Sequence, residues 1–288
     1  MIDKLINEEF SRNIGILSED EQRKLLESRV AVVGAGGVGG LHILTLARLG
    51  VGGFTIADPD VFEPANVSRQ FGASQKSFGR NKAEVLAEMV HDINPAAEVR
   101  VMPECVTEDN VASFLDGVQV LVDGIDFFEF NTRRMLFKQA RARGLYAVTS
   151  APLGFGSTLQ VFAPDGMDFD TYFGTSDEKS VEENLASFAA GLAPSPYHIK
   201  YMDLSRVDMK NKKGPAVAPA CTLATSLLTT EVVKILSASM KVHAVPHYIQ
   251  IDMYRQKLKK GYLIWGGRNP LQRLKTWLIY RQFKKRMA

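Results

Sequence analysis

The sequence predicts a doubly wound α/β protein with a mostly parallel sheet, an irregular insertion and a C-terminal amphipathic helix. A β-forming run at 30–33 enters a glycine-rich turn and is followed by a helical pattern and a second strand at 53–57. Strand-like and helix-like segments then alternate as far as residue 162, which is typical of parallel βαβ units. The segment 163–215 breaks this alternation, and residues 269–288 follow a helical period again.

Each element is expected from a local signal. Ser18 and Glu21 form a capping-box pattern, which predicts a helix from Glu19 to about Ser28 after a first short helix. Further helices follow apolar periods at 41–49, 83–93, 108–115 (capped by Thr107), 129–143, 219–237 and 270–288. Further strands follow runs of β-forming residues at 99–102, 118–122, 145–149, 158–162 and 248–252.

Two segments depart from this regular pattern. Prolines and glycines punctuate 163–215, where only 181–190 shows a helical period. A weakly regular stretch of this length usually forms a functional excursion or a mobile cover. We therefore expect one large domain over 1–268, with the insertion 163–215 inside it, and a basic amphipathic tail at 269–288.

Composition indicates an ordinary globular protein, since 45% of the 288 residues are hydrophobic and 23% are charged. The net charge is +3, but residues 268–288 hold seven basic residues and no acid, which leaves −4 for the remainder. No signal-peptide pattern is found, and no stretch reaches the roughly 18 apolar residues that span a bilayer. Cys105 and Cys221 form no C-x-x-C pair, so neither a structural zinc site nor a disulfide framework is expected. We therefore expect a cytoplasmic location.

The glycine-rich turn predicts a nucleotide site. Its glycines let backbone N–H groups approach a phosphate, and the following helix N-terminus adds a partial positive charge. Asp58, at the end of the second strand, can accept hydrogen bonds from ribose hydroxyls. Many dinucleotide enzymes share such a turn, so an NAD-dependent oxidoreductase is one alternative. That class usually needs a catalytic histidine, and no histidine stands at an obvious strand end in the first half of the chain.

Polar side chains follow the strand ends at the same edge. The loop after Asp58 offers amide and guanidinium donors to phosphate oxygens, although a solvated loop would have a similar composition. Lys82 falls in the first turn of a helix, where a cation is unfavourable unless an anion is nearby. Asp123 and Asp126 could hold Mg²⁺ or serve as a turn and helix cap. Cys221 begins the long late helix and is expected to be a small buried residue rather than a reactive thiol.

Residues 8–135 contain five motifs in the order and at the spacing of one known family. They are Gly34-Ala-Gly-Gly-Val-Gly39, Asp58-Pro-Asp60, Asn66-x-x-Arg69-Gln70, Lys82 and Asp123-Gly-Ile-Asp126. Together they resemble the ThiF/MoeB/HesA family, whose Rossmann-like members are adenylyltransferases for ubiquitin-like and sulfur-carrier proteins. The resemblance implies an enzyme that uses ATP and Mg²⁺ to adenylate a carboxylate, most often the C-terminal glycine of a small partner protein.

The resemblance also implies a role for each matched residue. Asp126 would hold Mg²⁺, and Arg12 loosely matches an arginine that reaches across a homodimer to the neighbour's ATP. Asp58 would bind the ribose hydroxyls, with Asp60 and Gln70 also in the nucleotide site. The remaining residues would contact the nucleotide or its phosphates: Gly34, Gly36, Gly37, Gly39, Asn66, Arg69 and Lys82.

Some features depart from the family pattern. The cysteine pairs that hold zinc in sulfur-carrier activators are absent, and 163–215 contains no cysteine for a thioester. The spacing from Asp126 to the next arginines, Arg133 and Arg134, is also altered. We therefore expect adenylation without thioester transfer.

Two alternatives stay open. One is a tRNA threonylcarbamoyladenosine dehydratase, because the missing zinc and the run at 106–110 resemble that branch. The other is a non-catalytic nucleotide-binding protein, against which the presence of Arg69, Lys82 and Asp126 argues. The basic tail could contact tRNA phosphates or lie on an acidic membrane surface.

Overall fold

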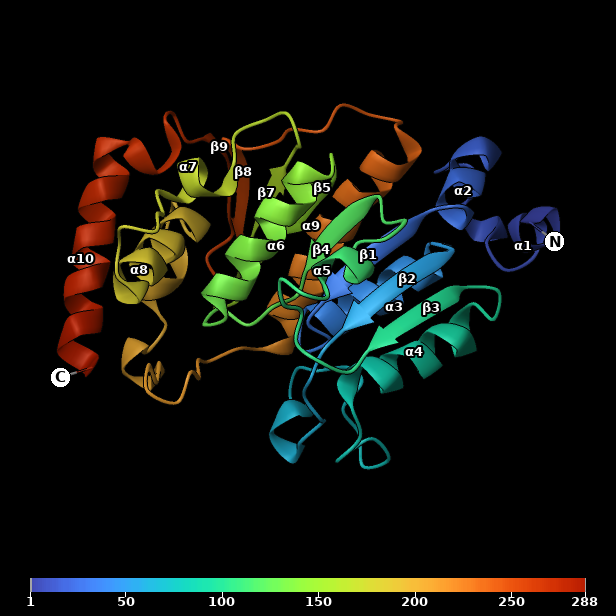
Figure 1. Cartoon of the computed structure of the whole chain (residues 1–288), viewed down its shortest axis with the longest axis horizontal. Coiled ribbons are helices and arrows are strands. Elements are labelled where there is room, and N and C mark those ends of the chain that lie inside the picture. The colour runs from blue at the N-terminus through green and yellow to red at the C-terminus, as the bar shows by residue number, and fades with distance from the viewer. Residues whose placement is uncertain (1, 288) are drawn as a thin grey trace.

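A single sheet organises the chain in the computed structural model, which describes residues 2–287 (Figure 1). Its strands are β1 (Arg29–Val33), β2 (Gly53–Ala57), β3 (Glu98–Met102), β4 (Val120–Asp123), β5 (Tyr146–Thr149), β6 (Pro152–Leu153), β7 (Gly156–Phe162), β8 (His247–Asp252) and β9 (Lys257–Tyr262). Their order is β3-β2-β1-β4-β5-β7-β8-β9, with β6 paired to β7. Strands β1 to β5 are parallel, whereas β7, β8 and β9 add antiparallel pairs.

The helices occupy most of the expected positions. They are α1 (Ile2–Asn7), α2 (Glu19–Leu26), α3 (Gly39–Arg48), α4 (Lys82–Ile93), α5 (Val111–Phe114), α6 (Phe130–Ala142), α7 (Phe169–Phe173), α8 (Val181–Leu192), α9 (Ala218–Ser237) and α10 (Pro270–Met287). Short 3-10 turns are η1 (Ser11–Asn13), η2 (Pro64–Asn66), η3 (Tyr197–Lys200), η4 (Leu204–Arg206) and η5 (Gly266–Arg268). The capping box of α2 is confirmed. The Thr107 cap is wrong, because the Asn110 side chain folds back onto the Thr107 N–H and α5 begins after it.

Two apolar cores lie on opposite faces of the sheet, which confirms the doubly wound α/β class. In β1, Val30 and Val32 join the core beneath α3, α4 and α9. Ala31 and Val33 point the other way, into the core formed with α5, α6, α7 and α8. This alternation follows from the period of two along a strand.

The first part of the expected insertion is well packed. Phe169 and Phe173 of α7 lie 4.6 Å apart between ring centroids, and Phe173 meets Phe188 of α8 at 4.8 Å. These rings form the second core with Phe162 of β7. Residues 163–193 therefore cover the sheet as part of the core, and the 3-10 turns η3 and η4 follow in a less regular stretch.

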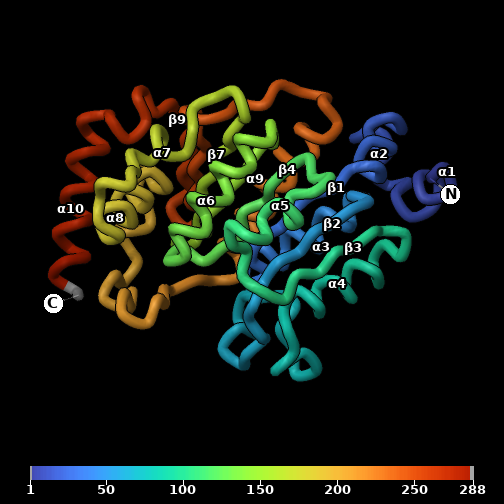
Figure 2. Tube along the Cα trace, in the orientation of Figure 1, coloured from blue at the N-terminus to red at the C-terminus, as the bar shows by residue number. Residues whose placement is uncertain are grey.

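Two long helices differ from expectation in detail. By length and composition α9 could cross a membrane, although no such helix was expected, because serines and threonines interrupt its apolar run. Half of its apolar window is buried, and it packs on α2, α3 and β7, as a core helix does. The C-terminal helix α10 is confirmed and packs beside α8 at one end of the molecule, opposite α1 (Figure 2).

Candidate functional site

The glycine turn after β1 lies at the carboxyl edge of the parallel strands. Gly34 adopts a φ of +82°, and a β-carbon added at Gly39 would lie 1.7 Å from the Gly34 carbonyl oxygen. A β-carbon added at Gly34 would lie 2.4 Å from the Gly124 carbonyl oxygen. These glycines therefore let the start of α3 pack directly on the loop after β4.

The other two predicted glycines face polar side chains. A β-carbon at Gly36 would lie 3.6 Å from the Gln70 amide nitrogen. One at Gly37 would lie 3.3 Å from the Cys221 sulfur and 3.7 Å from Cγ of Arg69. The structure thus brings Gln70 and Arg69 from the loop after β2, and the start of α9, around the turn.

Gln70 and Asn66 occupy different positions in the loop after β2. Gln70 is buried, and its side-chain oxygen has no hydrogen-bond partner among the described residues. This oxygen can therefore accept a hydrogen bond from a ligand or a water at the glycine turn. Asn66 is half-buried, and its side-chain oxygen accepts the Glu63 N–H at 2.9 Å to cap η2.

Asp58 ties the end of β2 to the glycine turn. Its Oδ2 accepts the Ala35 N–H at 2.6 Å, and its Oδ1 accepts the Asp60 N–H at 2.9 Å. Burial raises the pKa of Asp58, although these hydrogen bonds act in the opposite direction. Both oxygens of Asp58 have backbone partners, so this carboxylate shapes the turn. Asp60 is exposed and presents a second carboxylate close by.

Lys82 has the anion that its position in the first turn of α4 requires. Its ammonium is buried and lies 2.9 Å from the Asp60 carboxylate. Asn81 caps α4 through the Glu84 N–H and donates its amide to the Asp58 carbonyl oxygen at 2.9 Å. Asn81 was not among the predicted site residues, although asparagine before a helix is a known capping signal.

The loop after β4 is held by a buried ion pair. Arg133 lies 2.8 Å from the Asp123 carboxylate, and both side chains are almost fully buried. Arg133 also donates to the carbonyl oxygens of Ile125 at 2.5 Å and Asp126 at 3.2 Å. The Asp126 carboxylate is exposed and accepts the Phe128 N–H at 2.9 Å. Arg133, whose spacing from Asp126 departs from the family pattern, therefore fixes the loop that presents Asp126.

Asp126 could hold Mg²⁺ only together with ligands from a bound nucleotide or water. The described residues contain no group of three or more His, Cys, Asp or Glu side chains that could hold a metal by themselves. Mg²⁺ in nucleotide enzymes is commonly held by one or two carboxylates together with phosphate oxygens and water. Asp126 is exposed in the loop after β4, whose Gly124 lies against Gly34, so it meets that requirement, and a nucleotide would supply the other ligands.

Cys221 is buried, as expected for a small packing residue. Burial raises the pKa of its thiol, and the nearby Arg69 guanidinium opposes that effect. The thiol is therefore predominantly protonated at neutral pH, which suits a packing residue better than a nucleophile.

Arg12 is not brought to this site within one chain. It is exposed on η1, whose Asn13 contacts Gln22, and Gln22 in turn donates to the Leu49 carbonyl oxygen at the end of α3. The glycine turn lies at the other end of α3, which is about 15 Å long by its ten residues.

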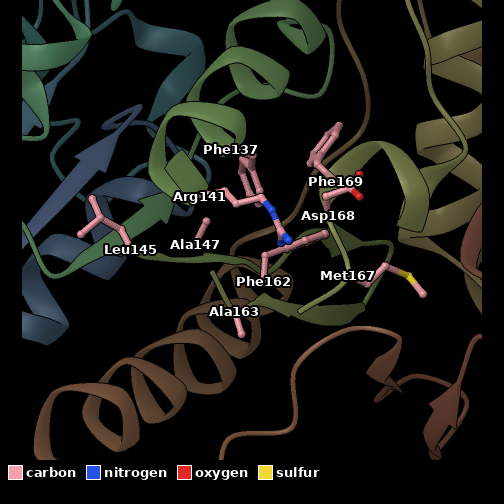
Figure 3. A pocket seen from close by; sticks show the side chains of 9 residues that line it. All are labelled: Phe137, Arg141, Leu145, Ala147, Phe162, Ala163, Met167, Asp168 and Phe169. Carbon is pink, nitrogen blue, oxygen red and sulfur yellow. The ribbon is translucent and has the colours of Figure 1, made fainter. Parts of the chain in front are cut away.

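A small pocket lies away from these residues. It is found between α6, the end of β7 and the start of α7, where Phe137, Arg141 and Phe169 line it (Figure 3). Its volume is about 10 Å³, which is room for one water molecule rather than a nucleotide.

The fold and this polar edge define a doubly wound α/β protein with a nucleotide-type glycine turn. A family model described as the ThiF family matches residues 10–263, so the chain belongs to that family. The SAMP-activating enzyme E1 of Haloferax volcanii is 35% identical over 62% of this chain and 66% of its own length. The tRNA threonylcarbamoyladenosine dehydratase of Escherichia coli is 36% identical over 41% of this chain and 44% of its own. This chain therefore aligns with less than two thirds of either relative.

A solved structure agrees with the fold. The crystal structure of E. coli MccB with SeMet MccA has a TM-score of 0.68 to this chain, at 19% identity, and covers 92% of this chain and 73% of its own. The family match ends at residue 263, before α10.

Proposed function

We propose that this protein transfers AMP from ATP to a carboxylate. A carboxylate oxygen attacks the α-phosphorus, the bond from that phosphorus to the bridging oxygen breaks, and pyrophosphate leaves. The products are an acyl-adenylate and pyrophosphate. This reaction needs alignment and neutralisation of phosphate charge rather than a strong base.

One observation supports the proposal: contacts join the glycine turn to Arg69 and Lys82, and the loop that the turn touches carries Asp126. Arg69 lies against Gly37, and Lys82 is linked to the turn through Asp60 and Asp58. Asp126 lies two residues after Gly124, whose carbonyl oxygen is in close contact with Gly34. Guanidinium and ammonium groups would bind the phosphates, and Asp126 would hold Mg²⁺, which neutralises phosphate charge when bound.

The acceptor is proposed to be the C-terminal carboxylate of a small ubiquitin-like or sulfur-carrier protein. The similarity to an enzyme named as activating SAMP supports this choice. A threonylcarbamoyl group on tRNA is the second candidate, supported by the similarity to the dehydratase and the absence of C-x-x-C pairs. Family membership argues against an NAD-dependent oxidoreductase. A cytoplasmic homodimer remains our expectation from the sequence.

Exchange of labelled pyrophosphate into ATP tests the reaction. Exchange that requires a small protein ending in Gly-Gly supports the first acceptor, and exchange that requires tRNA supports the second. Asp126→Asn should lower exchange at least about 100-fold, because the variant keeps the size of the side chain and loses its charge. The matched control is Asp109→Asn, at an exposed aspartate outside the site. Full exchange by Asp126→Asn would contradict the assignment of Asp126 as a Mg²⁺ ligand. If the unaltered chain shows no exchange with any acceptor, a non-catalytic nucleotide-binding protein is favoured.

A further inference from the structure

The C-terminal segment after β8 is strongly basic. Residues 253–288 contain eleven lysines and arginines and no acid, so the rest of the chain carries a net charge of −8. The segment forms the edge strand β9, η5 and α10. Among the described side chains, no ion pair joins one of these basic residues to an acid.

The basic segment stays together in space, because η5 follows β9 along the chain and contacts α10. Burial lowers the pKa of Lys275 on α10, and the positive charge of Lys259 on β9 lowers it further. The strand and the helix therefore contribute to one positive field. Such a field attracts an anionic surface and opposes the approach of a second copy of the same patch.

The same segment exposes large apolar side chains. Trp265 is 66% exposed, Leu271 68%, Leu274 53% and Trp277 50%, and Leu278 is also exposed. On α10 the leucines and Trp277 share the outward side. The Arg281 guanidinium lies 4.7 Å from the centroid of the Trp277 ring, so charge and apolar surface are interleaved there.

The inward side of α10 carries a buried polar residue, unlike the inward side of a helix that only completes an apolar core. Gln272 is buried at 3% exposure, and both polar atoms of its side chain lack partners among the described residues. Phe283 packs against the second core and so lies away from the exposed leucines, which means that α10 has apolar side chains on two sides rather than on the single face expected of an amphipathic helix. Because α10 packs beside α8 at the outer end of the molecule, its outward side faces away from the sheet (Figure 1).

We propose that the surface formed by β9, η5 and α10 binds an anionic lipid surface. Lysine and arginine are attracted to acidic headgroups, while leucine and tryptophan insert at the boundary between headgroups and acyl chains. RNA phosphates would satisfy the basic residues but would leave the leucines in water. This inference is independent of the proposed function, because none of the candidate nucleotide-site residues lies on this surface, and η5 and α10 lie beyond the family match, which ends at residue 263.

The chain provides its own optical probe. Its two tryptophans, Trp265 and Trp277, both lie on this surface. The full chain is mixed with vesicles of phosphatidylcholine alone or with phosphatidylglycerol, and with tRNA without lipid. We expect co-flotation with the anionic vesicles only, a blue shift of tryptophan emission, and quenching by brominated acyl chains. The bound fraction should fall as salt is raised.

Paired variants separate the two contributions. Leu274→Ser with Trp277→Ser should lower vesicle binding at least about ten-fold, and so should Arg281→Glu with Lys285→Glu. The matched controls are Met240→Ser and Lys241→Glu, at exposed positions outside the surface, which should bind as the unaltered chain does. These residues lie on the solvent side, so circular dichroism should show retained folding; if the first pair unfolds, Leu271→Ser alone replaces it.

The proposal is overturned if the unaltered chain neither floats with anionic vesicles nor shifts its emission at low salt. It is also overturned if binding is unaffected by both variant pairs, or if the surface binds tRNA through Arg281 and Lys285 while vesicles leave the tryptophans unquenched.

Discussion

Four aspartates at the carboxyl edge of the sheet have four different surroundings. Asp58 accepts two backbone N–H groups, Asp60 pairs with Lys82, and Asp123 pairs with Arg133 in the interior. Asp126 alone is exposed without an ion pair among the described side chains. The sequence predicted that these acids belong to one site, but their separate roles depend on contacts between loops distant in the chain.

Lys82 offers a direct test of phosphate binding. Lys82→Met keeps much of the buried stem and removes the charge that faces Asp60. We expect pyrophosphate exchange to fall at least about 100-fold. ATP binding by calorimetry should weaken as well, while the melting temperature changes little. Lys4→Met, at an exposed lysine of α1, is the control, and equal losses in both variants would contradict a specific role for Lys82.

His42 should make stability depend on pH. It is fully buried in α3 with Nδ1 2.9 Å from the Thr225 hydroxyl, and burial lowers its pKa to about 3. The unfolded chain binds a proton near pH 6.5 and the folded chain does not, so stability is present above that pH and is lost as the pH falls below it. Between pH 7 and pH 5 this residue should remove about 2 kcal/mol from the free energy of unfolding.

Urea unfolding of two variants at both pH values isolates this contribution. His42→Gln should show a smaller loss between pH 7 and pH 5 than the unaltered chain, even if it is less stable at pH 7. His91→Gln, at an exposed histidine of α4, should keep the original dependence. An unchanged pH dependence in His42→Gln would show that His42 accepts a proton in the folded state.

At the level of elements, the first βαβ unit was predictable because its requirements are local. A strand, a glycine turn and an apolar helical period all lie within residues 30–57, and the structure confirms each. Strand β9 was missed because lysines at 257, 259 and 260 do not alternate with apolar residues as a half-buried strand would. Its place is set by pairing with β8 at the sheet edge, which only the tertiary structure supplies.

The contact between α3 and the glycine turn should be intolerant of a methyl group. In Gly39→Ala the new β-carbon would lie 1.7 Å from a backbone oxygen, so the helix must shift. We expect a loss of about 3 kcal/mol in the free energy of unfolding, together with weaker ATP binding. Gly214→Ala is the matched control, since nothing lies within 4 Å of its added β-carbon. Equal thermal stability of the two variants would show that α3 has room to move.

At the scale of the whole molecule, the N-terminal residues and the candidate nucleotide site lie at different ends of α3. Arg12 therefore acts at an ATP site only if a second copy presents it, as the resemblance to the family implies. The prediction is a homodimer in which each site takes Asp126 from one chain and Arg12 from the other. Such a site would form only between two copies of the chain.

Complementation between two inactive variants tests this arrangement in full. Arg12→Ala and Asp126→Ala should each lose pyrophosphate exchange, whereas their equimolar mixture, after exchange of subunits, should recover about one quarter of the original activity. That fraction arises because half of the dimers are mixed and each mixed dimer holds one intact site. Sedimentation should give the mass of two chains. A chain that carries both substitutions should stay inactive, because its dimers contain no intact site. A monomer in sedimentation, or an active Arg12→Ala variant, would mean that each chain completes its own site without this arginine.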